Sequence, residues 1–109
     1  MRSNSTRPLI LVMAMVLVLL ATSNLFAQGA DTFKAKCAMC HGPDGAGKTT
    51  MGEKLKVRDL HSADVQKQSD AELSQFITKG KEKMPAFESK LSKEQIDHLV
   101  GYIRELGKK

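Results

Sequence analysis

The pentapeptide Cys37-Ala38-Met39-Cys40-His41 contains the only two cysteines in a chain of 109 residues. The spacing C-x-x-C-H is the signature of covalent haem attachment. If the segment is helical, Cys37, Cys40 and His41 share one face, so both thiols could bond to the haem vinyl groups while the imidazole reaches the iron. A buried haem would give a short chain a large apolar centre to fold around, as metals and disulfides do in other small domains.

The N-terminal segment has the layout of a secretory signal peptide. Arg2 and Arg7 form a basic start, an apolar run follows over residues 9–21, and small and polar residues follow over 22–28. This layout predicts export from the cytoplasm.

Cleavage is predicted after Ala27, with Ala30 as the fallback, so that residues 1–27 are the signal peptide and residues 28–109 the mature domain. The alternative is an uncleaved membrane anchor, because a long stretch without charge follows the basic start. The strongly apolar part has only 13 residues, however, whereas roughly 20 are needed to span a bilayer. A cleaved signal is therefore the preferred interpretation.

The predicted mature chain has 82 residues, the size of one small domain. Without the two arginines of the signal, 15 basic residues remain against 12 acidic ones, a mild positive excess. No basic block with interleaved aromatic residues occurs, so nucleic-acid binding is not predicted. Export also argues against a cytosolic dithiol pair, because free thiols in an oxidising compartment tend to close to a disulfide.

Helical periodicity occurs in three stretches and strand alternation in none, so the domain is predicted to be all-α. The first helix is expected to run from about Gly29 into the haem motif, with Phe33 and Cys37 one turn apart on the same side. Glycines and a proline in residues 42–47 then end it. Residues 51–60 are expected to form a short helix or a turn.

Two capping boxes start the other helices. Ser69 with Glu72 begins one helix, and Ser92 with Gln95 begins the last and clearest one. Apolar residues at helical spacing give each helix a core-facing side: Leu73, Phe76 and Ile77 in the first, and Ile96, Leu99, Val100, Ile103 and Leu106 in the last. Glycines end both helices, at Gly80 and Gly107.

The second axial position on the iron decides between carrying electrons and binding small ligands. Met84 is the leading candidate because it lies in an irregular segment between two helices, where Pro85 pushes it out of helical conformation. A methionine in this place is equally well explained as a soft core filler. Met51 is another candidate, and His61 with His98 could form a bis-histidine site instead.

The chain resembles the small class I cytochromes c, monohaem proteins of bacterial periplasms that are related to the short algal and cyanobacterial electron carriers. The resemblance covers nearly the whole of residues 28–109. It rests on Phe33, the haem motif, Gly42-Pro43-Asp44-Gly45, Met84-Pro85-Ala86-Phe87, and Leu99 with Tyr102 in the final helix.

The resemblance implies a cytochrome c fold, with three to four short helices wrapped around one covalently bound haem c. It implies thioether bonds from Cys37 and Cys40, with His41 as the proximal iron ligand and Met84 as the distal one. It also implies that the carbonyl of Pro43 orients the His41 imidazole, since ligating histidines commonly have such an outer partner.

A crossing of the first and last helices is the family's fold signature. The resemblance implies that Gly29 and Phe33 pack there across Leu99 and Tyr102. Residues 48–68 match the family only loosely and are left without assigned roles.

Three other interpretations are less well supported. Residues 42–49 fit the phosphate-binding pattern G-x-x-x-x-G-K-[ST], but that motif requires a preceding strand and a surrounding sheet. A zinc site at Cys37, Cys40 and His41 would lack the separated second ligand pair that is typical of structural zinc. A haem peroxidase or ligand-binding haem protein needs a displaceable sixth ligand with a distal acid or base, and no His or Arg accompanies Met84.

These patterns predict a monomeric, periplasmic one-electron carrier rather than an enzyme, with Met/His ligation raising the reduction potential of the iron. Five lysines flank the haem motif and the Met84 segment and are expected to dock an acidic redox partner, unless they are simply solvated: Lys34, Lys36, Lys79, Lys81 and Lys83. Two alternatives stay open. The chain could be the cytochrome subunit of a larger oxidoreductase, and it could be membrane-attached through a retained signal segment.

Overall fold

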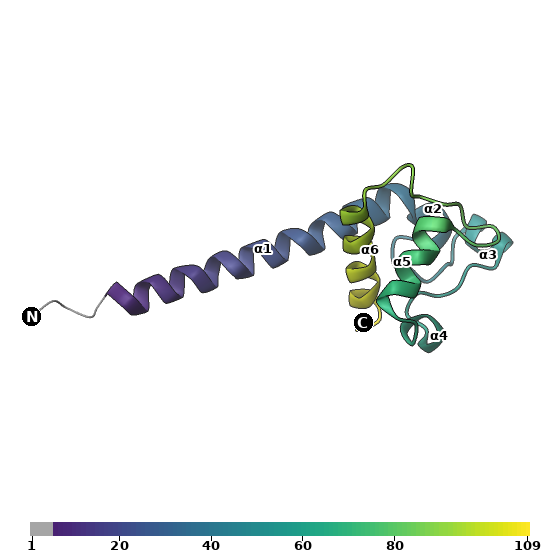
Figure 1. Ribbon diagram of the computed structural model, residues 1–109. Helices are drawn as coiled ribbons and strands as arrows, with labels where there is room; N and C mark the ends of the chain where they lie inside the picture. The colour runs from purple at the N-terminus through teal and green to yellow at the C-terminus, as the bar shows by residue number, and fades with distance from the viewer. Residues whose placement is uncertain (1–5) are drawn as a thin grey trace, which may run out of the picture.

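A computed structural model describes residues 6–109, in which six helices and no strand are found (Figure 1). The helices are α1 (Thr6–Lys36), α2 (Ala38–His41), α3 (Thr50–Leu55), α4 (Ala63–Gln66), α5 (Asp70–Lys79) and α6 (Lys93–Leu106). The all-α prediction is therefore confirmed, although short helices are more numerous than expected. Arg2, part of the predicted basic start, lies outside the described residues.

Helix α1 is one continuous helix of 31 residues, and its N-terminal part projects away from the rest of the molecule (Figure 1). The projection makes the molecule 72 Å long but only 29 by 24 Å across. The first helix was expected to begin near Gly29, and this is wrong, because α1 already begins at Thr6. Residues 9–28 contain neither glycine nor proline, so nothing in the apolar run interrupts the helix before it reaches the domain.

The projecting part of α1 is long and apolar enough to cross a membrane, with a mean hydropathy of 2.5 and none of its apolar window buried. A signal sequence near an N-terminus meets the same criterion. Large apolar side chains from Leu9 to Phe26 are accordingly exposed. The helix thus agrees with either a signal peptide or an anchor.

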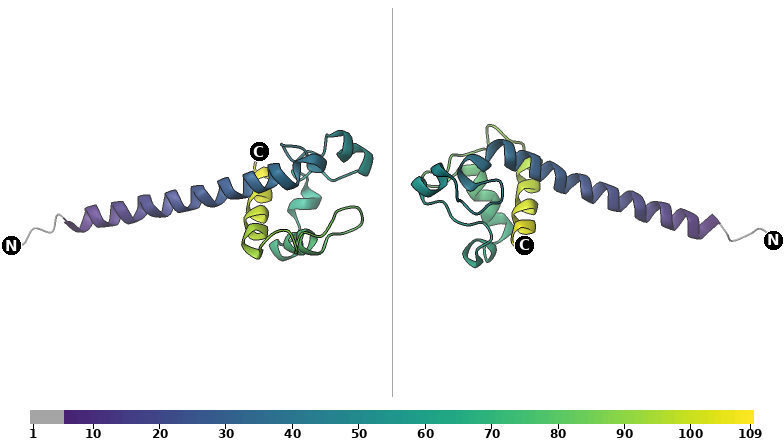
Figure 2. Two further views of the ribbon diagram at one scale, coloured as in Figure 1. Left: turned by 90° about the horizontal axis from the view of Figure 1, so that it is seen from above. Right: turned by 180° about the vertical axis from the view of Figure 1, so that it is seen from behind.

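The C-terminal part of α1 crosses α6, as both views in Figure 2 show. Phe33 and Leu99 are each only 1% exposed at this crossing, and the rings of Phe33 and Tyr102 lie 5.1 Å apart. A Cβ atom on Gly29 would lie 2.5 Å from the carbonyl oxygen of His98, so a glycine is required for the two backbones to come this close. The predicted helix crossing is confirmed.

The capping box predicted at Ser92 is complete, whereas the one predicted at Ser69 is only half formed, because no hydrogen bond from the Ser69 N–H to the Glu72 side chain is found among the described residues. Ser92 Oγ accepts a hydrogen bond from the Gln95 N–H at 3.1 Å, and Gln95 Oε1 accepts one from the Ser92 N–H at 2.9 Å, which completes the capping box. Ser69 Oγ accepts from the Glu72 N–H at 3.1 Å. Gly80 ends α5 with a φ of 69°, a left-handed conformation that favours glycine.

Helix α4 is not predicted from the sequence pattern, because Val65 is its one buried residue. Polar contacts hold it against α6 instead. Gln66 Nε2 donates to the carbonyl of Ile103 at 3.0 Å, and Arg104 Nη1 donates to the carbonyl of Gln66 at 2.9 Å. Gly107 leaves room for this contact, since a Cβ atom there would lie 2.3 Å from Gln66 Cδ.

The hydrophobic core joins α1, α4, α5, α6 and the loops before α4 and after α5 into one cluster. Its buried members are Phe33, Leu60, Val65, Leu73, Ile77, Phe87, Leu91, Ile96, Leu99, Val100, Ile103 and Leu106. Cys37, Met84 and Tyr102 are partly buried and pack against it. The core therefore contacts both the haem motif and the Met84 segment.

Candidate haem site

The haem motif lies at the junction of two helices. Helix α1 ends at Lys36, and Cys37 is the N-terminal cap of α2 with φ −118° and ψ −29°. The Cys37 N–H still donates to the Phe33 carbonyl at 2.8 Å, and the His41 N–H donates to the Cys37 carbonyl at 2.9 Å. The motif thus keeps one turn of helical hydrogen bonding between its first cysteine and its histidine.

The two thiols of the motif are free and half-buried. Burial, with a smaller effect of nearby Cys40, raises the pKa of the Cys37 thiol to about 11. The pKa of a dithiol redox pair is instead lowered, because the thiolate is the reactive form. The Cys37 thiol therefore lacks the lowered pKa that is typical of a reactive cysteine in a dithiol redox centre.

His41 provides the clearest sign of a missing partner in the site. Its Nδ1 atom is buried and has no hydrogen-bond partner, and burial lowers the pKa of the imidazole. The neutral form that burial favours is also the form that ligates a metal. Its ring lies 6.3 Å from that of Phe33, which connects it to the α1–α6 crossing.

The expected hydrogen bond between the Pro43 carbonyl and His41 is absent, because Nδ1 has no partner. The chain turns directly after the motif, at Gly42 with a φ of 79°, and Pro43 is exposed. The loop after the motif contacts the backbone of the histidine instead of its ring, because the Gly47 N–H donates to the His41 carbonyl at 2.7 Å. The role expected of Pro43 remains a prediction.

Met84 lies in a tight turn that follows α5. The N–H of each of Lys81 and Met84 donates to the carbonyl of the other, at 3.1 and 3.0 Å, and Glu82 between them has a φ of 55°. The Phe87 N–H then donates to the Ile77 carbonyl at 3.0 Å, which attaches the end of the turn to α5. These contacts place a half-buried Met84 against the core cluster that Cys37 also contacts.

The other ligand candidates lie in different surroundings. Met51 is 39% exposed on α3. His61 Nδ1 lies 2.7 Å from a carboxylate oxygen of Asp59, in an exposed pair. His98 lines a surface hollow beside the α1–α6 crossing, together with Asp31. Met51 is not among the partly buried hydrophobic residues that pack against the core cluster, whereas Met84 is.

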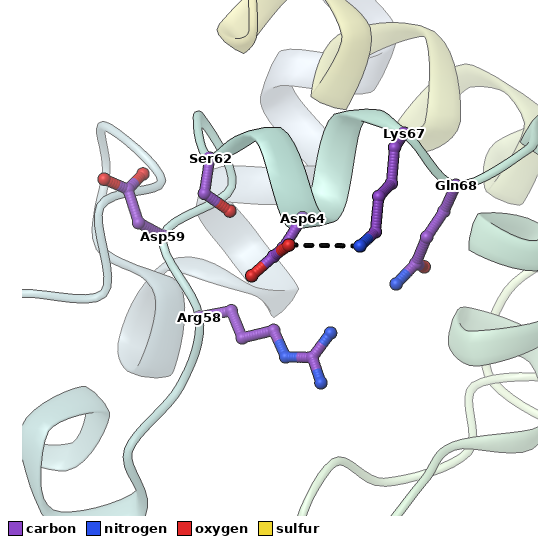
Figure 3. Close-up of a pocket in the computed structure, with 6 residues that line it drawn as sticks. All are labelled: Arg58, Asp59, Ser62, Asp64, Lys67 and Gln68. Atoms are coloured by element: carbon purple, nitrogen blue, oxygen red, sulfur yellow. Dashed lines mark hydrogen bonds and ion pairs between the residues drawn. The ribbon is translucent and has the colours of Figure 1, made fainter.

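Residues 58–68, which the sequence left without a role, form a polar surface hollow (Figure 3). Its lining consists of Arg58, Asp59, Ser62, Asp64, Lys67 and Gln68. Asp64 and Lys67, which lie one turn apart at α4, form an ion pair at 3.2 Å on one side of it, and the Arg58 side chain extends below them from the preceding loop. None of the haem-motif residues lines it. Among residues 6–109, no cluster of three or more His, Cys, Asp or Glu side chains could hold a metal ion on its own.

Comparison with known proteins gives consistent matches. The family described as cytochrome c oxidase, cbb3-type, subunit III matches residues 24–103. A cytochrome c6 from Synechococcus sp. is 32% identical over 114 residues, covering 94% of this chain and 96% of the relative. The solved structure of the KustC0563 c-type cytochrome has a TM-score of 0.67 and 34% identity, covering 72% of this chain and 95% of that one.

The chain belongs to the class I c-type cytochromes. A relative from Azorhizobium caulinodans, the cbb3-type cytochrome c oxidase subunit FixP, is 36% identical over 83 residues, but the chain spans only 27% of its length. The structural similarity together with 34% identity also confirms the cytochrome c fold.

This family membership means that the chain carries a covalently bound haem c with its iron and acts as a monohaem electron carrier. The described residues of the cytochrome fit that group. Two free thiols stand one helical turn apart, and the imidazole beside them has a buried nitrogen without a partner. A half-buried thioether lies against the same core as the first thiol. Residues 42–49, which match a phosphate-binding pattern, follow a helix rather than a strand.

Proposed function

We propose that this chain is an exported one-electron carrier in which Cys37 and Cys40 bond to haem and His41 and Met84 are the axial iron ligands. The observation that carries the proposal is that Cys37 and Met84, 47 positions apart in the sequence, pack against one core cluster. A ligand pair drawn from the haem motif and from a distant turn would then be close enough in the fold to hold the same group.

When bound, the haem supplies a one-electron couple, and the protein sets its potential through the axial ligands. His41 would bind through its neutral imidazole. The thioether of Met84 is a soft, weakly basic ligand, which raises the reduction potential relative to a second imidazole. Filling both positions suppresses ligand activation and favours reversible electron exchange, so we assign the chain no enzymatic reaction of its own.

Pro43 retains a proposed role as an outer partner of His41. Metal-ligating histidines almost always donate their second ring N–H to a carbonyl, carboxylate or water, and the unpaired Nδ1 of His41 needs such an acceptor. In the haem-bound protein the carbonyl of Pro43, two residues away, would serve. This contact would leave Nε2 for the iron.

Cleavage after Ala27 is the processing that agrees best with the fold. It leaves Gly29 in the mature domain, where its close contact with the His98 carbonyl supports the α1–α6 crossing. Cleavage after Ala30 would remove that glycine. We therefore propose a periplasmic chain that starts at Gln28. Mass spectrometry of the exported protein tests this, because start sites at Met1, Gln28 and Asp31 give different masses.

The charge of the mature domain is uneven, which supports docking to an acidic partner. Residues 34–58 carry six basic and two acidic side chains, and residues 79–90 carry four basic and two acidic ones. The rest of the mature domain carries five basic and eight acidic side chains. The positive charge thus gathers in the segments that hold the haem motif and Met84, and a small, transient complex of a monomer would be oriented by it.

An optical spectrum of the haem-loaded protein tests the ligand assignment. We expect a weak far-red band from methionine sulfur on ferric haem in the wild type, its loss in Met84→Ala, and its retention in the matched variant Met51→Ala. The ferrous wild type should bind carbon monoxide slowly. A band that survives Met84→Ala, or rapid carbon monoxide binding by the wild type, would refute His/Met ligation and favour a ligand-binding or peroxidase function.

A second candidate function is that of a cytochrome subunit in a larger oxidoreductase. The match to a cbb3-type subunit III family and the similarity to FixP favour it. Native gels of soluble and detergent-solubilised membrane fractions, stained for haem, distinguish the two. A free carrier migrates at its own small mass in the soluble fraction, whereas a subunit migrates with a membrane complex.

A further inference from the structure

All four backbone carbonyls of helix α2 have hydrogen-bond donors. The carbonyl of Ala38 accepts from the Gly42 N–H at 2.9 Å. The carbonyls of Met39 and Cys40 lie 2.8 and 3.1 Å from the hydroxyl of Thr49. The carbonyl of His41 accepts from the Gly47 N–H at 2.7 Å. Because carbonyls at the end of a helix have no partner within it, such outside donors decide how the end is held.

Three of these four carbonyls are satisfied by residues 47–49, the end of the segment that matches the phosphate-binding pattern. We call residues 42–49 the capping loop. Its glycines provide the left-handed turns that bring it back, with φ values of 79° at Gly42, 79° at Gly45 and 74° at Gly47. The pattern G-x-x-x-x-G-K-T therefore encodes a loop that folds onto the end of the haem motif.

The Thr49 hydroxyl connects the haem motif to the next helix. It accepts a hydrogen bond from the Gly52 N–H at 2.8 Å, which makes it the N-terminal cap of α3. A hydroxyl has one donor hydrogen, so it shares that hydrogen between the Met39 and Cys40 carbonyls. One oxygen atom thus has two separate roles, as acceptor toward α3 and as donor toward α2.

Helix α3 packs directly on the same carbonyl. A Cβ atom on Gly52 would lie 2.3 Å from the Cys40 carbonyl oxygen and 2.4 Å from that of Gly47. The carbonyl of Cys40 is therefore held in two ways, by the hydrogen bond from the Thr49 hydroxyl and by the close approach of the Gly52 backbone. The peptide that joins Cys40 to His41 has little freedom to rotate.

We propose that Thr49 is a positioning residue for the haem: its donated hydrogen bond holds the Cys40–His41 peptide and so sets the orientation of the His41 imidazole on the iron. The hydrogen bonds of the Thr49 hydroxyl all go to backbone atoms, so Thr49 acts through the backbone that carries the thiols and the imidazole. The inference rests on haem attachment at the motif. It goes beyond that function because it assigns an outer residue to the ligand geometry.

The donor and acceptor roles of the hydroxyl can be separated by substitution. Thr49→Ser keeps both roles. Thr49→Asp keeps the acceptor that caps α3 but, as a carboxylate, cannot donate to the carbonyls. Thr49→Val removes both without adding charge. Ser69→Ala is the matched control, because Ser69 caps α5 in the same way and has no contact with the haem motif.

Two properties of the haem-loaded ferric protein report on the imidazole rather than on stability: the proton NMR shifts of the haem methyl groups and the reduction potential. We expect both to shift in Thr49→Asp and Thr49→Val and to stay at the wild-type values in Thr49→Ser and Ser69→Ala. A further outcome is that neither Thr49→Asp nor Thr49→Val attaches haem while the other two variants do so normally. The hydrogen bond donated by Thr49 is then required already for haem attachment to the motif, which also supports the proposal.

Two outcomes are unfavourable, and they have different meanings. If Thr49→Asp or Thr49→Val holds haem with unchanged methyl shifts and potential, Thr49 is a helix cap only and the inference is wrong. If the wild type itself attaches no haem, the proposed function fails and Thr49 is not at issue.

Discussion

The α1–α6 crossing and the Met84 turn differ in how the chain holds them. At the crossing, Phe33 and Leu99 are almost fully buried, and Gly29 brings two backbones into contact. In the turn, Met84 is half-exposed, and the local backbone is held by one pair of hydrogen bonds with Lys81. The crossing is held by contacts between parts of the protein chain alone, whereas the turn presents the Met84 side chain to the haem, which must first be attached. Stability and ligand chemistry should therefore respond to different substitutions.

Phe33→Ala should cause the largest loss of stability. Removing a fully buried phenylalanine costs about 3–5 kcal/mol, because both its transfer energy and its packing are lost. We expect the free energy of unfolding of the haem-loaded protein, measured by chemical denaturation, to fall by that amount while the far-red methionine band persists in the folded fraction. Loss of the band without loss of stability would mean that the crossing controls the ligand and that the two regions are not separable.

Gly80→Ala should weaken the turn and the ligand together. Gly80 has φ 69° and ψ 174°, a region that is essentially restricted to glycine, and occupying it with another residue costs about 1–3 kcal/mol. A Cβ atom there would also lie 2.5 Å from the Met84 carbonyl oxygen. We therefore expect a moderate loss of stability and a far-red band that disappears at lower temperature than in the wild type.

Gly101→Ala is the matched control for that substitution. Gly101 lies within α6, and a Cβ atom there would meet nothing within 4 Å. Replacing a helical glycine by alanine should then raise the free energy of unfolding by about 0.5–1 kcal/mol, with no effect on the methionine band. Because the two substitutions should change global stability in opposite directions, a band in Gly80→Ala that is as thermally stable as in Gly101→Ala would show that the conformation of Gly80 is not needed to hold Met84 on the iron.

The same division explains what the sequence could predict. The capping box at Ser92 and the apolar stripe of α6 are local patterns, so the last helix follows from them alone. The contact between Gly29 and α6 was available only through the family resemblance, because it depends on residues some 70 positions apart. The thiols and the imidazole were found because C-x-x-C-H is a chemical motif with few other uses. Met84 was preferred as the second ligand only through the family resemblance, because a methionine in that place is equally well explained as a core filler.

Other features left no such local signal. Helix α4 is too short for periodicity, and the contacts that hold it come from Arg104 and Ile103 of a distant helix. The role of Thr49 could not be predicted, because a hydroxyl bonded to two carbonyls depends on how a glycine loop folds back. The hydrogen bond expected at Pro43 was not found, and its test needs the haem-bound state.

Reversing the charge near Met84 should have the smallest effect on stability but a clear effect on electron-transfer rate. Lys81 and Lys83 are the better targets, since Lys79 is paired with Glu88 at 2.7 Å. For Lys81→Glu with Lys83→Glu, we expect reduction of anionic ferricyanide to slow by roughly ten-fold at low ionic strength. The difference should largely vanish at high salt, where charges are screened within a few ångströms.

The control for this pair carries the same charge change on another part of the surface. Lys67, directly after α4, and Lys108, near the C-terminus, are both exposed, and each forms an ion pair with a carboxylate three residues before it. Figure 1 places α4 and the C-terminus at the opposite end of the domain from the start of the loop between α5 and α6. If the positive segments are a docking surface, Lys67→Glu with Lys108→Glu should slow the reaction much less. Equal slowing by the two pairs would show that only net charge matters, and the lysines beside Met84 would then be ordinary solvated side chains.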